Sequence, residues 1–148
     1  MSAFGFVRLV HVIVMAAWMG SALLAPADVR DSLARGPDAI GPLMLRLRRT
    51  ARLMNAAAYA TVLTGLALVA LGRGWATPPR IWVGLGLTLV SIAIGRVLIR
   101  PAVGALVAAH GRAEPLGTEE QAQLSRRFAQ GVRAEDLTRL GALATMLL

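Results

Sequence analysis

Long apolar runs separated by arginine-rich gaps constrain this chain more than any other feature of its sequence. The runs cover residues 4–27, 53–71 and 81–99, and a fourth apolar segment covers residues 137–148. A membrane-spanning helix needs about 20 consecutive apolar residues, so each of the first three runs is long enough to cross a bilayer. The sequence therefore predicts an all-α fold, a transmembrane four-helix bundle that forms a single membrane domain over residues 1–148.

The fourth apolar segment is shorter than a complete span. It follows a polar stretch, residues 111–136, which has the pattern of a soluble amphipathic helix in a connector. Only about 12 residues then follow, against about 20 for a complete span. We therefore expect the fourth helix to be incomplete as given. The final letters TMLL, which include no Trp, Tyr or basic anchor, favour a truncated chain.

The charge of the chain favours a membrane surface as its partner. Its 16 basic residues are all arginine, its acidic residues number 8, and the formal net charge is +8. In a soluble protein this excess would suggest nucleic acid, but here the arginines lie beside apolar segments, which favours anionic lipid headgroups. The sequence has no cysteine, which excludes a disulfide framework and a thiolate metal site. Lipid bilayer and anionic headgroups are therefore the expected partners, and nucleic acid is not.

The distribution of arginine predicts an orientation. Residues 28–52 and 100–136 are rich in arginine, whereas the gap at residues 72–80 has few. By the positive-inside rule, the two rich loops are cytoplasmic and both termini are periplasmic, in a multi-pass protein of a bacterial inner membrane. Within residues 28–52 we expect a short basic amphipathic helix on the membrane interface. Its apolar contacts would be Leu43, Leu45, Leu47 and Leu53.

The first apolar run contains the most unusual side chains for a membrane span. At helical spacing, His11, Met15 and Trp18 fall on one face, and Gly20 leaves room beside that face. An imidazole without a partner is costly in hydrocarbon. We therefore expect this stripe to face the other helices of the bundle.

Three roles for His11 are compatible with its position. It can be an axial ligand of haem b, since one imidazole on a transmembrane helix is what such a haem needs. A copper site would add Met15 and Met19 as thioether ligands, although Met19 lies off the stripe. A structural histidine would instead form a hydrogen bond with a neighbouring helix, for example with Tyr59 or Asn55.

A haem at His11 would need any second axial ligand to come from another helix. Met54 lies near the cytoplasmic end of the second helix, and Tyr59 lies only slightly deeper. Met146 is about ten residues into the fourth helix, at a depth similar to that of His11. Met146 is therefore the thioether that we expect to be level with His11.

Small residues form rows on the second and third helices. Such rows allow helix backbones to approach closely, so we expect packing contacts along them. The rows consist of Ala57, Thr61 and Gly65 on the second helix and of Gly84, Thr88, Ser91 and Gly95 on the third. At the end of the third run, we expect Arg96 to snorkel to the membrane surface and Pro101 to kink the helix.

The stretch VRLVHVIVMAAWMGSALLAPADVR resembles the first helix of the HemJ family of membrane protoporphyrinogen oxidases and of related CopD-like four-helix families. These families share a His, a Trp seven residues later and a Gly two beyond it, here His11, Trp18 and Gly20. The resemblance implies a four-helix membrane fold with His11 as a haem-ligand candidate. The third helix of the HemJ family opens with a Trp followed by a His and a Lys that matter for activity. After Trp82, this chain has Gly84 and Gly86 at those positions.

Two functions follow as expectations. Paired carboxylates are absent from the predicted spans and no Ser, His and acid set is apparent, so no catalytic residues are predicted. The first expectation is a non-enzymatic accessory or structural subunit, whose small-residue rows pack against a larger membrane complex or a second copy of the chain. The alternative, implied by the resemblance, is a HemJ-like haem-binding oxidoreductase of porphyrin metabolism.

Overall fold

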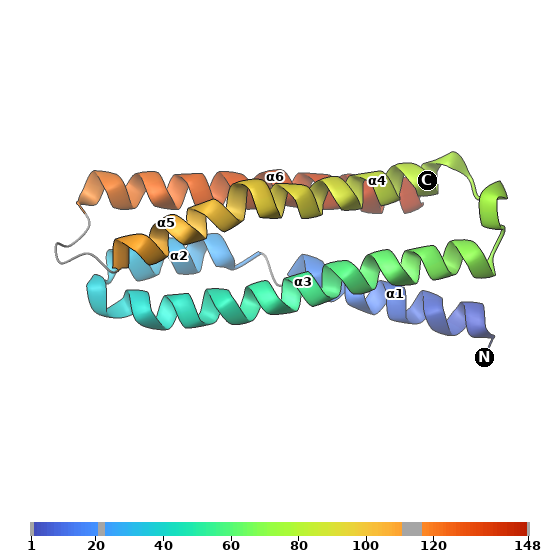
Figure 1. Ribbon diagram of the computed structural model, residues 1–148, viewed down its shortest axis with the longest axis horizontal. Coiled ribbons are helices and arrows are strands. Elements are labelled where there is room, and N and C mark those ends of the chain that lie inside the picture. The colour runs from blue at the N-terminus through green and yellow to red at the C-terminus, as the bar shows by residue number, and fades with distance from the viewer. Residues whose placement is uncertain (1, 21–22, 111–116, 148) are drawn as a thin grey trace.

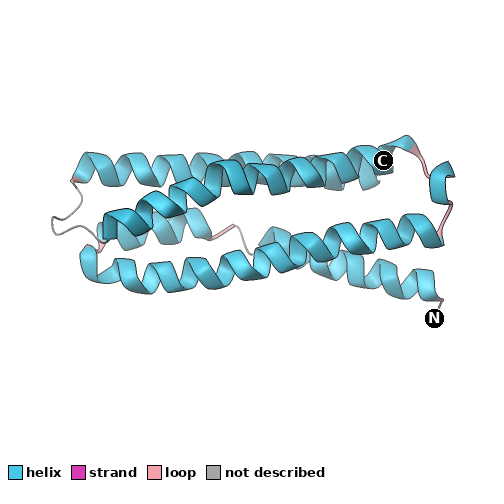
Figure 2. Cartoon of the chain, in the orientation of Figure 1, coloured by secondary structure: helices cyan, strands magenta, loops and turns pink. Residues whose placement is uncertain are grey.

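The computed structural model describes residues 2–20, 23–110 and 117–147, and these residues form helices and no strands. Four long helical segments run side by side in an elongated bundle (Figures 1 and 2). The predicted all-α four-helix bundle is confirmed. The N-terminus and the C-terminus lie toward the same end of the bundle (Figure 1).

The first segment consists of α1 (Ala3–Gly20) and α2 (Ala25–Ala34), and the second is the single helix α3 (Ile40–Leu71). The third consists of α4 (Pro79–Ile94), a π-helical turn η3 (Gly95–Ile99) and α5 (Arg100–His110). The fourth is α6 (Thr118–Leu147). Short 3-10 turns, η1 (Pro37–Ala39) and η2 (Gly74–Ala76), precede α3 and α4.

Three of these segments are long and apolar enough to cross a membrane. By length and composition they are residues Ala3–Ala34, Ile40–Leu71 and Pro79–Ala108. Their outer faces expose large apolar side chains that a water-soluble bundle would bury, such as Leu63, which is 67% exposed, and Ile13, which is 57% exposed. These features indicate a membrane protein whose outer surface contacts the lipid bilayer.

The ends of the helices differ from those predicted. The first run, residues 4–27, is not one helix, because α1 ends at Gly20 and α2 begins at Ala25 with Pro26 in its first turn. Proline is favoured at a helix start, where its missing N–H needs no partner. The stretch 28–52 is not a loop either, because α2 occupies its first part and α3 is already helical from Ile40.

The third and fourth segments also extend past their predicted limits. Helix α5 continues the third segment to His110, and α6 is helical from Thr118, well before the predicted start at Leu137. The amphipathic helix expected in the connector is therefore present, but it is continuous with the fourth segment, and the described residues of 100–136 are mostly helical. The backbone continues because arginine, glutamate, glutamine, leucine and alanine all favour a helix in water as well as in lipid.

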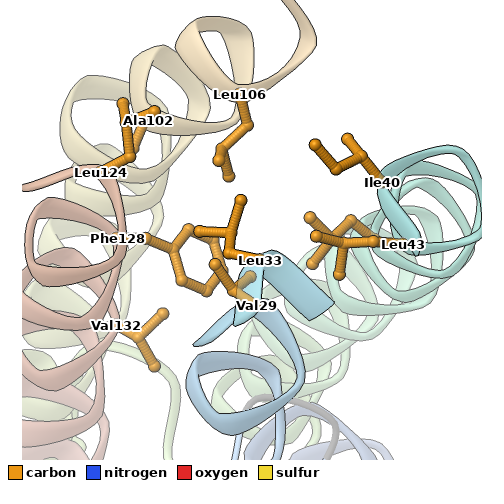
Figure 3. Packing of buried hydrophobic residues seen from close by; sticks show 10 residues of the cluster. Val29, Leu33, Ile40, Leu43, Ala102, Leu106, Leu124, Phe128 and Val132 are labelled. Atoms are coloured by element: carbon orange, nitrogen blue, oxygen red, sulfur yellow. The ribbon is translucent and has the colours of Figure 1, made fainter. Parts of the chain in front are cut away.

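The polar ends of the four segments form their own bundle with a buried core. We call this part the polar half, and it comprises α2, residues 40–52 of α3, α5 and residues 118–136 of α6. Its core residues include Val29, Leu33, Leu43, Leu106 and Phe128, which point toward one another in Figure 3. Arg46 of α3 also binds Asp28 of α2 through two hydrogen bonds of 2.9 and 2.8 Å. The polar half is thus packed like a soluble helix bundle.

This core corrects the prediction of an interfacial helix. Leu43 and Leu47 are buried inside the polar half, whereas Leu45 and Leu53 are exposed. The leucines alternate in sequence, so a helix places them on different faces. Only part of the set can therefore contact a membrane.

The π-helical turn has a local cause. Pro101 has no N–H and cannot donate to the carbonyl four residues earlier, which disturbs the hydrogen-bond ladder at this point. The N–H of Arg100 binds the carbonyl oxygen of Gly95, five residues earlier. The segment then continues as α5 and changes direction (Figure 1), in line with the predicted kink at Pro101.

Candidate functional site

The bundle consists of two closely packed helix pairs. Helix α1 packs along α3, and α4 packs along α6, whereas α3 meets α4 and α5 over a much smaller area. Figure 1 shows α3 running beside the α4 to α5 segment on the near side of the bundle. The space between α3 and this segment holds two large cavities.

The interface between α1 and α3 contains the predicted stripe. His11, Met15 and Trp18 are the buried residues of α1, which confirms that this face meets protein. On α3, Ala57 and Thr61 are buried, and a Cβ atom added at Gly65 would lie 3.4 Å from His11 Cε1. The second-helix row therefore packs within the chain.

Gly20 does not have the predicted packing role. It is exposed at the end of α1, and a Cβ atom added there would meet nothing within 4 Å. The resemblance that singled out Gly20 therefore has no packing counterpart at this position.

His11 forms its hydrogen bond with Thr64 and not with Tyr59 or Asn55. Nδ1 of His11 lies 2.8 Å from Thr64 Oγ1. Because the Thr64 hydroxyl donates to the carbonyl oxygen of Ala60 at 2.6 Å, His11 Nδ1–H is the donor in this pair. A neutral imidazole then has Nε2 as its acceptor nitrogen. The predicted structural histidine thus has a partner on the expected helix, five residues beyond Tyr59.

His11 and Met146 line the same cavity, as their predicted depths require. The volume of this cavity is about 30 Å³, which has room for about one water molecule. A porphyrin does not fit between these helices as they are packed, so the arrangement does not support haem ligation by His11 and Met146. Among the described residues, no three His, Asp or Glu side chains gather into a possible metal site.

The third-helix row packs against α6. A Cβ atom at Gly84 would lie 2.8 Å from Thr145 Oγ1, and Thr88 and Ser91 are buried. The hydroxyl of Ser91 donates to the carbonyl oxygen of Glu135 at 3.4 Å. Both rows of small residues are therefore occupied by helices of the same chain and are not available to an external partner.

A buried ionic cluster, which sequence reasoning missed, joins the two helix pairs. We call it the Arg139 cluster, and it comprises Trp18, Glu135, Asp136 and Arg139. The guanidinium of Arg139, only 2% exposed, pairs with Glu135 and lies 3.2 Å from an Asp136 oxygen. It stacks 4.6 Å from the centre of the Trp18 ring and donates to the Trp18 carbonyl oxygen at 3.4 Å.

Paired carboxylates were expected to be absent from the predicted spans, and this pair lies just outside the fourth of them. Glu135 and Asp136 directly precede Leu137, the start of that predicted span, in a stretch interpreted as a polar connector. A signal was present, because Glu135 and Arg139 are four residues apart and share one helix face. Two atoms of the cluster, Glu135 Oε2 and Arg139 Nε, have no hydrogen-bond partner among the described residues.

Two adjoining cavities lie between α3 and the α4 to α5 segment. The first, of about 620 Å³, has polar side chains in its wall, and we call it the polar cavity. The second, of about 580 Å³, is mostly apolar and reaches into the polar half, and we call it the apolar cavity. They share five lining residues and so form one continuous side groove. The shared residues are Ala51, Met54, Asn55, Ile99 and Val103.

The polar cavity combines groups of both charges. Arg96 and Arg100 line it from the α4 to α5 side, Tyr59 lines it from α3, and Glu135 of the Arg139 cluster lines it from α6. Arg96 was expected only to snorkel, but its guanidinium donates to the Tyr59 hydroxyl across the groove. The lining of the apolar cavity adds Arg48 and Arg52 to these cations.

Comparisons of the chain with family models, with curated proteins and with solved structures give no match. The resemblance of the first helix to the HemJ and CopD-like families therefore stays a prediction.

Proposed function

We propose that this chain is a membrane protein that binds a phospholipid, with the lipid phosphate in the polar cavity of the side groove. The observation that supports this proposal most is the position of Arg96 and Arg100 beside a cavity that continues into an apolar one. A phospholipid has the same order of parts, because its anionic headgroup is joined to apolar chains.

The donors of the polar cavity suit a phosphate. Arginine side chains form strong, charge-assisted hydrogen bonds with phosphate oxygens. Arg96 and Arg100 lie four residues apart and line one wall, while Asn55 and Tyr59 add neutral donors from α3. A phosphate has enough acceptor oxygens for several such donors at once.

The size of the groove also suits a lipid. Ligand sites have volumes of about 300 to 1,000 Å³, and the two cavities have about 620 and 580 Å³. The walls of the apolar cavity include Leu47, Phe128 and Val132, which can contact an acyl chain. We place the groove where the apolar part of α3 begins, with the phosphate toward the apolar spans and the acyl chain toward the polar half, opposite in direction to a lipid of the adjacent leaflet.

The orientation follows from the arginines of the polar half. We propose that the polar half lies in the cytoplasm of a bacterium, in contact with anionic headgroups of the inner membrane, and that both termini are periplasmic. Because the chain has no cysteine, a single cysteine introduced at exposed Ala34 or Ala76 shows on which side of the membrane that residue lies. In intact cells, a thiol reagent that does not cross the inner membrane should label Ala76→Cys and not Ala34→Cys. The opposite pattern would reverse the orientation.

The proposed role is non-enzymatic binding, and the two earlier expectations have weaker support. The accessory-subunit hypothesis depended on two rows of small residues, and both rows pack within the chain. The haem hypothesis depended on His11, which lies beside a cavity of about 30 Å³. A Soret band that disappears in His11→Ala would show that these helices open, and would favour the HemJ-like alternative.

The lipid proposal is tested by the double variant Arg96→Gln, Arg100→Gln. We expect the purified wild-type chain to retain phospholipid after delipidation and incubation with a bacterial polar lipid extract. Each charge-assisted hydrogen bond contributes about 1.5 to 3 kcal/mol, so losing these cations should weaken binding at least about tenfold. Lipid phosphorus per chain, measured in detergent, gives the result.

A matched control keeps the total charge of that variant. Arg126 and Arg127 are exposed on α6 and do not line the side groove, so Arg126→Gln, Arg127→Gln should retain lipid like the wild type. Equal loss in both double variants would show unspecific attraction to headgroups. No retained phospholipid in the wild type would contradict the proposed function.

A further inference from the structure

We infer that the phospholipid of the side groove carries a primary ammonium in its headgroup, as phosphatidylethanolamine does. This inference depends on the proposed function and names the class of lipid that the polar cavity selects. The inference is based on the carboxylate of Glu135, which lines the polar cavity but has no role in binding an anionic phosphate.

Glu135 lines the polar cavity and has one buried acceptor oxygen that is unused. Its side chain is 6% exposed, and Oε1 accepts a hydrogen bond from Arg139. The other oxygen, Oε2, has no partner among the described residues. A buried carboxylate oxygen without a hydrogen bond is costly, so a ligand that donates to it gains affinity.

The local backbone leaves room beside this carboxylate. Gly95, which also lines the polar cavity, lies against it, and a Cβ atom added there would be 3.4 Å from Oε1 and 3.7 Å from Oε2. A Cβ atom at these distances makes ordinary van der Waals contact, so a side chain longer than that of alanine is needed to crowd the carboxylate. The glycine therefore keeps this part of the wall open.

The charges of the cluster favour a cation over a neutral donor. Two carboxylates, of Glu135 and Asp136, share the single guanidinium of Arg139, which leaves one negative charge in excess when all three are ionised. Arg96 and Arg100 line the same cavity from the α4 to α5 segment. One cavity thus contains groups of both charges, which complements a zwitterion with a phosphate and an ammonium.

The number of N–H groups on the headgroup decides between the common zwitterionic lipids. A primary ammonium has hydrogens to donate to Glu135 Oε2, whereas a trimethylammonium has none. Phosphatidylglycerol has hydroxyl donors but no positive charge. Comparing these three headgroups therefore separates the contribution of the donor from that of the charge.

The test is a titration of the purified full-length chain in detergent micelles with phosphatidylethanolamine, phosphatidylcholine and phosphatidylglycerol of identical acyl chains. Bound lipid is counted by native mass spectrometry. We expect the wild type to prefer phosphatidylethanolamine about tenfold over each of the others, the size of one charge-assisted hydrogen bond. Equal binding of the three lipids would overturn the inference and leave the proposed function standing.

The variant Glu135→Gln tests whether Glu135 causes the preference for phosphatidylethanolamine. In Glu135→Gln, an amide oxygen can still accept from Arg139, but the negative charge is gone. We expect this variant to lose the preference for phosphatidylethanolamine while still binding phosphatidylglycerol. Glu119→Gln, an exposed site on the same helix, should keep it. A preference that survives in Glu135→Gln would contradict the inference.

The outcomes separate the two proposals. Two results together support both proposals. The double variant Arg96→Gln, Arg100→Gln should bind none of the three lipids, and Glu135→Gln should bind them without the preference for phosphatidylethanolamine. Binding of none of the lipids by the wild type removes both. If Glu135→Gln does not fold, the comparison of the three lipids on the wild-type chain still tests the inference, because it needs no variant.

Discussion

Arg139→Met should be among the most destabilising single substitutions in this chain, at a cost of about 3 to 5 kcal/mol in the free energy of unfolding. The side chain of Arg139 is almost fully buried, and it satisfies the carboxylate of Glu135. Methionine fills a similar volume but leaves that carboxylate buried without a cation. Helicity followed by circular dichroism during unfolding of the detergent-solubilised protein measures the effect.

Two controls identify the cause of that loss. Arg133→Met, on the exposed side of the same helix, should change stability little. The double variant Arg139→Met, Glu135→Leu removes both charges, and it should recover most of the stability because no buried carboxylate remains unpaired. If the double variant is no more stable than Arg139→Met, the loss comes from packing and not from the unpaired charge.

Gly84→Leu should separate α4 from α6, with a cost of about 1 to 3 kcal/mol, typical of an overpacked core. A Cβ atom at Gly84 would lie 2.8 Å from Thr145 Oγ1 and 3.5 Å from the carbonyl oxygen of Ala142. The Thr145 hydroxyl cannot move without losing its 2.7 Å hydrogen bond to that carbonyl. The unfolding measurement used for Arg139 gives this value as well.

Gly86→Leu is the matched control, two residues further along the same helix. A Cβ atom at Gly86 would meet nothing within 4 Å, and the position is exposed. Leucine favours a helix over glycine by several tenths of a kcal/mol or more, so this variant should be as stable as the wild type or slightly more stable. Equal destabilisation by both leucines would show that α4 and α6 do not pack as described.

The sequence was sufficient to predict the helices but not their ends. Hydrophobicity marks where a helix can enter lipid, whereas the backbone stops only where hydrogen bonding or sterics require it. Helix α3 therefore runs from Ile40 through its basic residues to Leu71, and α6 runs from Thr118 into its apolar part. Proline at position 26 was the local signal for the break in the first run.

The candidate site was only partly accessible to sequence reasoning. Helical spacing was enough to predict that His11, Met15 and Trp18 share a buried face. It could not bring Trp18 to Arg139, because these residues are 121 positions apart and meet only through the packing of two helix pairs. The side groove arises from the separation of α3 from α4, which no pattern within a single helix encodes.

Helix α3 is continuous, so a change in the tilt of its apolar part also moves its polar end. A helix of 32 residues is about 48 Å long, and roughly its first 20 Å extends beyond the apolar part. Hydrophobic mismatch changes the tilt of such a helix in the bilayer. Because no joint interrupts α3 between its two parts, any change in tilt moves the Leu43 end sideways and alters its fit against Phe128. A thinner or thicker bilayer would therefore displace residues of the polar half, which lies outside the apolar spans.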